Sequence, residues 1–264
     1  MWDHFILGTI QGITEWLPIS SEGAILLANK LWLHSALSFD EAIREALFLH
    51  LGTFLAALIY FSKDVLCLSK ACFQFSKESK DHQNMVRFLV ISTLISGALG
   101  IFLLKVVSTF TEQFEHNGRV ITVLIGFLLL ITAFLELKAK RGGYRREENI
   151  TLGDCFLLGI VQGFAALPGL SRSGLTVSTL LFRKYHEATA LRLSFLMSLP
   201  IVLGGNILLN YKELHASPES LVGLAASFFF GIATIHILLK VAQKINFGYF
   251  VIGFGILTLI SAFI

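Results

Sequence analysis

Charged residues are scarce in this chain. Asp, Glu, Lys and Arg make up 15% of its 264 residues, whereas 55% are hydrophobic and the mean hydropathy is +0.73. A soluble globular domain carries about 25% charged residues, so the composition excludes that class and indicates an integral membrane protein. Proline is also scarce, and three of the four prolines (Pro18, Pro168 and Pro200) fall inside apolar stretches, where proline ends or kinks a helix.

Several kinds of site are missing as well. The three cysteines, Cys67, Cys72 and Cys155, do not have the spacing of metal ligands. No dinucleotide- or nucleotide-binding fingerprint occurs, so we expect no organic cofactor and no nucleic-acid partner. The N-terminus has no basic start and no obvious cleavage site, and we expect no removable signal peptide there.

Long apolar runs dominate what is present. They are continuous rather than alternating, which favours transmembrane helices over a β-barrel, and a full span needs about 20 apolar residues. Five stretches qualify, and a sixth qualifies with a kink at Pro200. The expected spans are 42–61, 88–104, 120–137, 191–210, 221–239 and 247–264.

Two further apolar regions, 2–31 and 152–182, are interrupted by polar breaks at Pro18 and Pro168. Each half is too short to cross a membrane, so each region is predicted to be a re-entrant helical hairpin. A hairpin followed by three spans occurs twice, and because three is odd, the second unit enters from the opposite side. The predicted fold is an all-α polytopic membrane protein, one membrane domain of two inverted-topology repeats. The repeats cover residues 1–140 and 150–264.

Basic residues are distributed unevenly between the predicted loops. With the N-terminus outside, the inner loops hold fifteen Lys and Arg residues and the outer side holds five, while Arg172 lies within the second hairpin. Cytoplasmic loops carry such an excess. We therefore expect a multi-pass protein of the cell (plasma) membrane with both termini outside. The inner loops are 62–87, 138–146, 183–192 and 240–244.

The two hairpin breaks have similar sequences. Residues 11–23 read Gln-Gly-Ile-Thr-Glu-Trp-Leu-Pro-Ile-Ser-Ser-Glu-Gly, and residues 162–174 read Gln-Gly-Phe-Ala-Ala-Leu-Pro-Gly-Leu-Ser-Arg-Ser-Gly. Polar side chains inside a hydrocarbon layer are costly and usually functional. Two such segments, one in each repeat, indicate a site where the hairpin tips meet near the middle of the membrane.

Arg172 is the main candidate for binding an anion. It stands where an apolar helical run begins, and Ser171 or Ser173 can cap that helix. Free N–H groups and partial positive charge at a helix N-terminus suit a phosphate, and the planar guanidinium matches phosphate oxygens in a bidentate way. The hydroxyls of Ser171, Ser173 and Thr176 could complete the site. The alternative is that Arg172 only pairs with a carboxylate for structure.

The first segment supplies carboxylates. Gln11 and Glu15 are four residues apart on one helix and share a face. Glu15 could hold a divalent cation, Mg2+ or Ca2+, on a diphosphate, or act as a base toward water. Ser20 and Ser21 could cap the second half-helix, and a serine there could be a nucleophile. The plainer alternative is that Glu15 pairs with Arg172 and the serines only cap.

The two segments resemble the undecaprenyl-diphosphate phosphatase family of bacterial membrane enzymes, the bacitracin-resistance type. The family's Glu/Gln-x-x-x-Glu motif before Pro-x-Ser-Ser is matched by Gln11, Glu15 and 18–21, and its Pro-Gly-x-Ser-Arg-Ser-Gly-x-Thr motif is matched without a gap by 168–176. A third similar stretch is 187–200, so the resemblance covers nearly the whole chain.

The resemblance implies hydrolysis of a polyprenyl diphosphate to the monophosphate and inorganic phosphate on the outer side, which recycles the lipid carrier for cell-wall polysaccharide synthesis. It implies catalytic roles for Glu15, Ser21 and Arg172. Partners would be the polyprenyl diphosphate and membrane lipids, and a homodimer is left open. The predicted substrate-binding residues are Gln11, Ser20, Ser171, Ser173, Thr176, His50 and Glu22.

One departure concerns the position after Ser-Ser-x-Gly, where the family usually has a histidine that is a candidate acid–base residue. This chain has Ala24 there. Three readings stay open: Glu15 activates water, with or without a metal; Glu22 or another group takes the histidine's role; or the protein is an impaired phosphatase that binds or transports the lipid. His50, near the middle of a predicted span, is either a site residue or a histidine bonded to a neighbouring helix.

Overall fold

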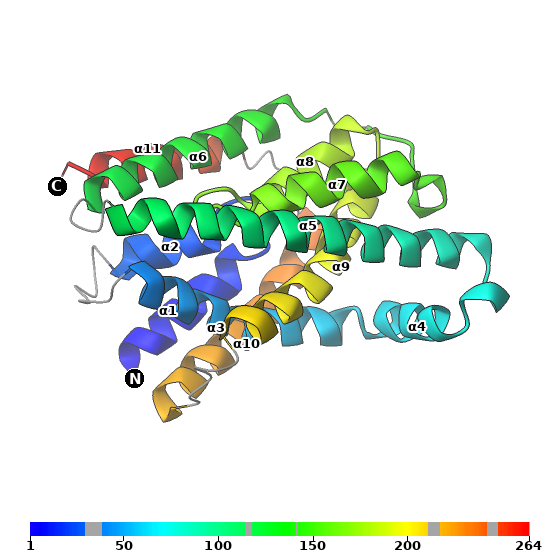
Figure 1. The fold of residues 1–264 in the computed structure, drawn as a ribbon, viewed down its shortest axis with the longest axis horizontal. Coiled ribbons are helices and arrows are strands. Elements are labelled where there is room, and N and C mark those ends of the chain that lie inside the picture. The colour runs from blue at the N-terminus through cyan, green and yellow to red at the C-terminus, as the bar shows by residue number, and fades with distance from the viewer. Residues whose placement is uncertain (30–38, 114–117, 141, 211–216, 242–247, 264) are drawn as a thin grey trace.

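The computed structural model describes residues 1–29, 39–113, 118–140, 142–210, 217–241 and 248–263. Within these ranges the regular elements are all helices, with no strand, as Figure 1 shows, which confirms the all-α polytopic prediction. Four helices are long and apolar enough to cross a membrane, and a bent pair makes up to five spans. Predicted positions 30–31, 247 and 264, and the counted charges Lys30, Arg141, Lys212 and Lys244, lie outside the described residues.

Each half begins with two short helices and continues with longer ones. The first half contains α1 (Trp2–Thr14), α2 (Ser21–Ala28), α3 (Phe39–Tyr60), α4 (Ser62–Phe73), α5 (Lys80–Gln113) and α6 (Gly118–Lys138). Within the described ranges the second half repeats this order without a counterpart of α4. Its helices are α7 (Leu152–Phe164), α8 (Arg172–Phe182), α9 (Glu187–Gly205), α10 (Pro218–Val241) and α11 (Gly248–Ser261).

Some boundaries differ from the prediction. Residues 62–87, expected to connect two spans on the inner side, are mostly helical: they contain α4, which bends by 85° from α3, and the first turns of α5. Their place on the inner side stays a prediction. α5 has 34 residues and extends beyond the expected 88–104, because hydropathy marks only the apolar part of a helix. α11 has 14 residues, about 21 Å at 1.5 Å per residue, which is shorter than the expected span 247–264. α9 continues through Pro200 to Gly205.

Both predicted hairpin breaks are present, and both are closed by a serine cap. Ser20 accepts a hydrogen bond from Gly23 N at 3.2 Å, and Ser171 accepts one from Gly174 N at 3.1 Å. Such caps satisfy N–H groups that have no partner within the helix. Gly169 has a φ of +102°, which only glycine adopts without strain, and this turns the second tip toward α6.

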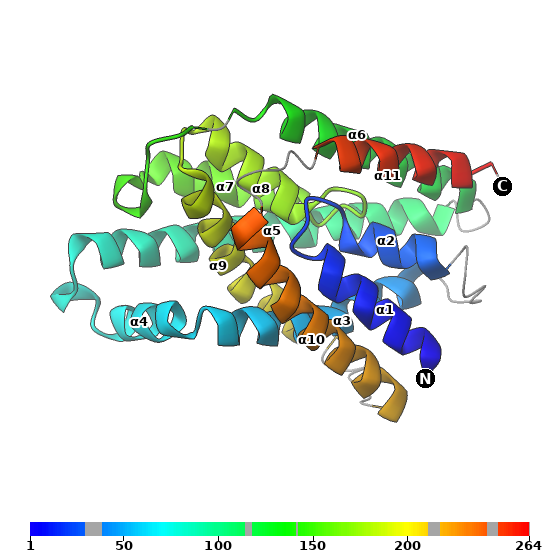
Figure 2. The ribbon, with the colours of Figure 1, turned by 180° about the vertical axis from the view of Figure 1, so that it is seen from behind.

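The two halves pack against each other in equivalent ways. α1 lies along α10 and α7 lies along α5, and the first pair is seen from behind in Figure 2. Glycines allow both approaches: a Cβ on Gly8 would lie 2.0 Å from Gly223 O, and one on Gly159 would lie 2.8 Å from Ile95 Cβ. α1 and α7 each present two glycines four residues apart, Gly8 and Gly12 on α1 and Gly159 and Gly163 on α7, which is a small-residue face suited to close packing in a membrane. The equivalence supports two repeats, while their insertion from opposite sides stays a prediction.

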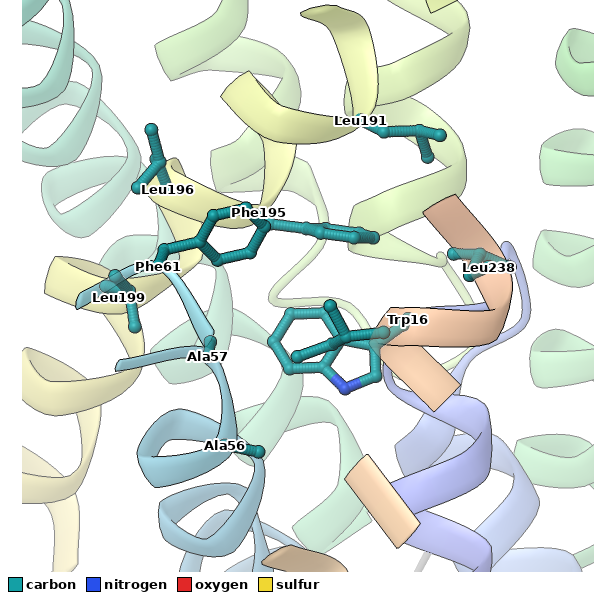
Figure 3. Close-up of a cluster of buried hydrophobic side chains, with 10 residues drawn as sticks. Trp16, Ala56, Ala57, Phe61, Leu191, Phe195, Leu196, Leu199 and Leu238 are labelled. Atoms are coloured by element: carbon teal, nitrogen blue, oxygen red, sulfur yellow. The ribbon is translucent and has the colours of Figure 1, made fainter. Parts of the chain in front are cut away.

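Trp16 anchors the tip of the first hairpin in an apolar cluster (Figure 3). Its side chain is 2% exposed, and its ring meets Phe195 of α9 edge-on with centroids 4.9 Å apart. Ala57 of α3 and Leu238 of α10 belong to the same cluster. Such aromatic pairs contribute about 0.5–1.5 kcal/mol beyond area burial, so the backbone beside Glu15 is firmly placed.

A polar network holds the linker between the two halves. The fully buried Asp154, near the start of α7, accepts hydrogen bonds from Arg145 and Arg183, each at 2.7 Å. The Tyr185 hydroxyl donates to the same carboxylate at 3.0 Å. Burial, with the neighbouring Asp154 carboxylate, raises the pKa of Tyr185, so this hydroxyl remains a donor. The network fixes α7 and α8 to the linker and thereby supports the second hairpin.

Candidate active site

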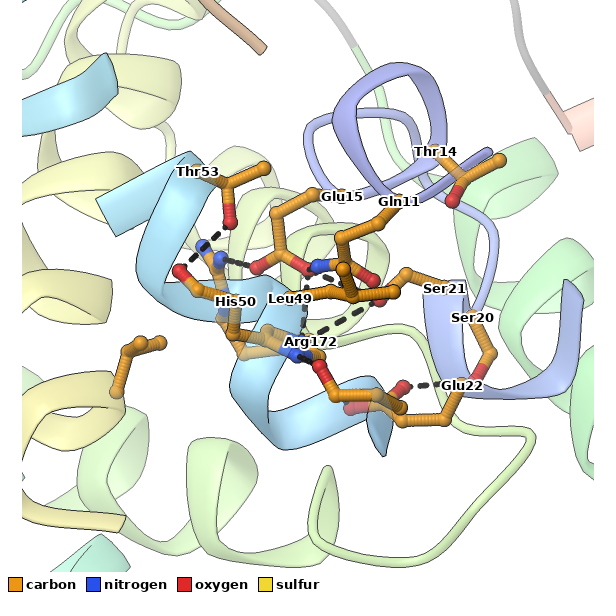
Figure 4. Close-up of polar contacts among 12 residues, drawn as sticks. Gln11, Thr14, Glu15, Ser20, Ser21, Glu22, Leu49, His50, Thr53 and Arg172 are labelled. Carbon is orange, nitrogen blue, oxygen red and sulfur yellow. Dashed lines mark hydrogen bonds and ion pairs between the residues drawn. The ribbon is translucent and has the colours of Figure 1, made fainter. Parts of the chain in front are cut away.

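An ion pair between the two hairpin breaks forms the centre of the site (Figure 4). Glu15 directly follows α1 and Arg172 is the first residue of α8, and Arg172 Nη2 donates to Glu15 Oε1. Their side chains are 6% and 13% exposed, so each charge depends on the other for compensation. The predicted meeting of the tips is confirmed, and the pair itself is the contact that the sequence offered as the plainer alternative to a catalytic role for Glu15.

Two further contacts orient the guanidinium of Arg172. Its Nη1 donates to Ser194 O of α9 at 3.3 Å, and the group lies over the Trp16 ring, 5.7 Å from the ring centroid. Cations are attracted to the face of an indole. The plane of the guanidinium is therefore set by three elements: the first hairpin, α8 and α9.

The second carboxylate oxygen of Glu15 gathers side chains of the first hairpin. Glu15 Oε2 accepts hydrogen bonds from Gln11 Nε2 at 3.0 Å and from Ser21 Oγ at 2.9 Å. The predicted shared face of Gln11 and Glu15 is confirmed. A hydroxyl bonded to a carboxylate is the arrangement of an activated nucleophile with its base.

His50 reaches this carboxylate from α3. Its Nε2 lies 3.0 Å from Glu15 Oε2 and 3.4 Å from Glu22 Oε1, and 3.5 Å from Ser21 Oγ. The other ring nitrogen, Nδ1, lies 2.6 Å from Ala46 O one turn earlier on α3. The structure thus places His50 in the site, and its imidazole faces the serine and both carboxylates.

Glu22 and Ser20 form the more open edge of the site. The Glu22 side chain is 28% exposed, compared with 6% for Glu15. Ser20 Oγ donates to Glu22 Oε2 at 3.1 Å and accepts from Gly169 N at 3.2 Å. Ser20 therefore both caps α2 and links the two tips.

The three hydroxyls of the second motif hold α8 in place. Ser173 Oγ donates to Leu17 O of the first hairpin at 2.6 Å, and Ser171 Oγ lies 3.2 Å from Ser173 Oγ. Thr176 Oγ1 lies 2.7 Å from Ser194 Oγ. These hydroxyls are bonded to protein groups in this arrangement, and phosphate binding by them stays a prediction.

A metal ion does not fit the donor set around Glu15. Within the described ranges, no group of three or more His, Cys, Asp and Glu side chains is arranged to hold a metal. One oxygen of Glu15 faces Arg172 and the other accepts from Gln11, Ser21 and His50, so a cation would compete with groups already there. Mg2+ and Ca2+ require several oxygen ligands.

Sequence reasoning missed some participants. The carbonyls of Leu17, Ala46 and Ser194 accept bonds from site residues, but every residue has a carbonyl, so no signal marks them. Trp16 carried a signal, because it lies within the first motif. Its Nε1 is a buried donor with no partner in the described structure, and an unmade bond of this kind costs about 1–3 kcal/mol.

Comparison with known proteins gives the same assignment. The family model described as bacitracin resistance protein BacA matches residues 4–260. The chain belongs to this family. A relative from Methanococcoides burtonii, named undecaprenyl-diphosphatase, is 42% identical over 99% of this chain and 98% of its own. One of the same name from Methanothrix thermoacetophila is 38% identical over 96% and 94%. Undecaprenyl-diphosphatase 4 from Bacillus cereus is 33% identical over 99% and 97%.

Proposed function

We propose that this BacA-family protein hydrolyses undecaprenyl diphosphate to undecaprenyl phosphate and inorganic phosphate. Membership of the family and the names of its relatives support this activity. One observation locates the active site: Arg172 of the second hairpin contacts Glu15, which in turn accepts from Ser21 of the first hairpin. A cation, a carboxylate and a hydroxyl that meet inside an apolar protein have the chemistry of phosphoryl transfer.

Arg172 is the phosphate-binding residue in this proposal. It lies at the N-terminus of α8, where the helix dipole favours an anion, and its fork can bind two phosphate oxygens. A phosphate would exchange for Glu15 as the partner of the guanidinium. The charge that grows on the phosphoryl oxygens during transfer is then stabilised in a dry site.

Ser21 is the nucleophile and Glu15 its base. As Arg172 moves from Glu15 to the phosphate, the carboxylate becomes more basic and takes the Ser21 proton along the existing 2.9 Å bond. Ser21 Oγ then attacks the distal phosphorus, the bridging P–O bond breaks, and undecaprenyl phosphate leaves. Water hydrolyses the phosphoserine. In the alternative, Glu15 activates water directly, and rapid quenching would then trap no phosphoserine.

A divalent cation belongs on the substrate rather than in a preformed protein site. The ion pairs around Glu15 disfavour a cation there, whereas a diphosphate offers oxygens of its own, and Mg2+ is commonly bound through substrate phosphates. In this proposal Glu15 acts as a base and holds no metal ion.

The site belongs to a multi-pass membrane protein, and the proposal places it toward the outer side of the cell membrane. The excess of basic residues in the predicted inner loops supports this orientation. The isoprenoid tail would lie between the helices near the Trp16 cluster, with the diphosphate at the hairpin tips. A homodimer would be compatible with this arrangement.

A second candidate is a carrier for polyprenyl phosphate. Many secondary transporters have two broken helices that meet near the middle of the membrane. In addition, this chain has Ala24 at the position where the family usually has a histidine. A carrier would need the anion site of Arg172 but no nucleophile, which makes turnover the deciding measurement.

Phosphate release by the purified protein in detergent tests the proposal. We expect release from a polyprenyl diphosphate, reduced by orders of magnitude in Glu15→Gln and in Arg172→Ala because each loses half of the central pair. The matched controls are Glu78→Gln and Arg87→Ala, whose side chains contact His82 and Phe75 away from the site. No release from folded wild-type protein that still binds the lipid would contradict the enzyme and favour the carrier.

A further inference from the structure

The groups that face the two ring nitrogens of His50 indicate that both nitrogens are protonated, which makes the imidazole a second cation in the site. Nδ1 lies 2.6 Å from the carbonyl oxygen of Ala46, and a carbonyl only accepts, so Nδ1 carries a proton. Nε2 faces carboxylate oxygens of Glu15 at 3.0 Å and Glu22 at 3.4 Å. Lone pairs on both sides would repel, so Nε2 carries a proton too.

This cation differs from Arg172 in one chemical respect. Arginine keeps its protons in proteins, whereas an imidazolium can give one up and take it back. His50 Nε2 lies 3.5 Å from Ser21 Oγ, where the phosphoryl group would be attached. The Ala46 carbonyl fixes the ring, as the third member of a catalytic triad orients its histidine.

We propose that His50 is the general acid–base residue of this enzyme, and so replaces the histidine that is absent at Ala24. The inference rests on the proposed hydrolysis. When Ser21 attacks and Glu15 takes its proton, His50 Nε2 gives its proton to the bridging oxygen, and the polyprenyl phosphate leaves in protonated form. When water attacks the phosphoserine, His50 takes a proton from the water and Glu15 returns its own to Ser21 Oγ. One water is consumed, and the three side chains return to their starting states.

The charges around His50 are compatible with this cycle. Glu15 at the end of α1 and Glu22 on α2 face the imidazole, and Arg172 of α8 faces Glu15 from the other side. Two carboxylates thus offset two cations. When Ser21 attacks, Glu15 gains a proton as His50 loses one, and both changes reverse when water attacks, so no charge in the site is left uncompensated.

Phosphate release by His50→Ala and His50→Gln tests the inference. General acid–base catalysis contributes about 100- to 10,000-fold, so we expect kcat to fall by at least about 100-fold in both variants. His50→Gln keeps a polar side chain of similar reach, which guards against a folding defect. The matched control is His236→Ala, which removes a histidine bonded to Tyr60 at 3.3 Å and should keep wild-type turnover.

The pH profile separates an acid–base role from a structural one. The acid must be protonated, so wild-type kcat/KM should fall as the pH rises through the titration of His50, and His50→Gln should lack this limb. Ala24→His in the wild-type background should raise the rate by less than about threefold, because a histidine already serves. Unchanged turnover in His50→Ala, a preserved basic limb in His50→Gln, or a tenfold gain in Ala24→His would each overturn the inference. A folded wild type without turnover would contradict the proposed hydrolysis itself.

Discussion

At the scale of single residues, the site consists of groups that compensate one another. The single carboxylate of Glu15 is contacted by Arg172, Gln11, Ser21 and His50. Its removal would leave several buried donors without a hydrogen-bond partner. Buried pairs of this kind are costly to break on one side. Their presence between apolar helices is better explained by chemistry than by stability, because hydrophobic residues would fill the same space at lower cost.

The shape of the Arg172 side chain should matter as much as its charge. Arg172→Lys keeps a cation but loses the planar fork that reaches Glu15 and the Ser194 carbonyl together. We expect kcat/KM to fall about 100-fold, measured as phosphate release. Arg87→Lys, at a cation–π contact with Phe75 outside the site, is the control. Activity of the Arg172→Lys variant within about threefold of wild type would show that a point charge suffices.

Sequence alone predicted much of the site, because polar side chains in apolar sequence are conspicuous. Gln11, Glu15, Ser21 and Arg172 were found in this way, and the structure brings them into contact. The geometry of His50 could not be predicted. Its distance to Ser21 depends on how α3 packs beside α1 and α2, which no local pattern in the sequence encodes.

At the scale of elements, hydropathy predicts the apolar part of a helix and little else. It identified both hairpins and the cores of the long helices. It missed α4 because that helix contains Lys63, Asp64 and Lys70 among its apolar residues. These charges lower the mean hydropathy of the segment, so it does not stand out as an apolar helix. The 85° bend at Phe61 could not be predicted either, because no proline or glycine lies at the bend.

The glycine face of α1 should be essential to the fold. A Cβ on Gly8 would lie 2.0 Å from a backbone oxygen of α10, so Gly8→Ala must push the two helices apart, and overpacking of this kind costs about 1–3 kcal/mol. We expect a lower midpoint of thermal unfolding in detergent. Gly253→Ala on α11 is the control, since nothing lies within 4 Å of its added Cβ. Equal midpoints for the two variants would contradict the close packing.

At the scale of the whole molecule, the equivalent packing of α1 on α10 and of α7 on α5 relates the halves to each other. The halves are not equal in chemistry. The first supplies Glu15, Ser21, Glu22 and His50, while the second supplies Arg172. In the proposed mechanism one half carries the proton chemistry and the other carries the anion site, so we expect neither half to be active alone.

The proposed orientation can be tested with the protein's own thiols. Cys72 on α4 is exposed and Cys155 is buried, and the charge bias places α4 in the cytoplasm. In Cys67→Ser protein, a membrane-impermeant maleimide added to intact cells should not label Cys72, whereas labelling should follow in inside-out vesicles. Asp3→Cys with Cys67→Ser and Cys72→Ser should behave oppositely, because position 3 is exposed near the N-terminus that the bias places outside. Labelling of Cys72 from outside would reverse the orientation, and the hairpin tips would then take their substrate from the cytoplasmic leaflet.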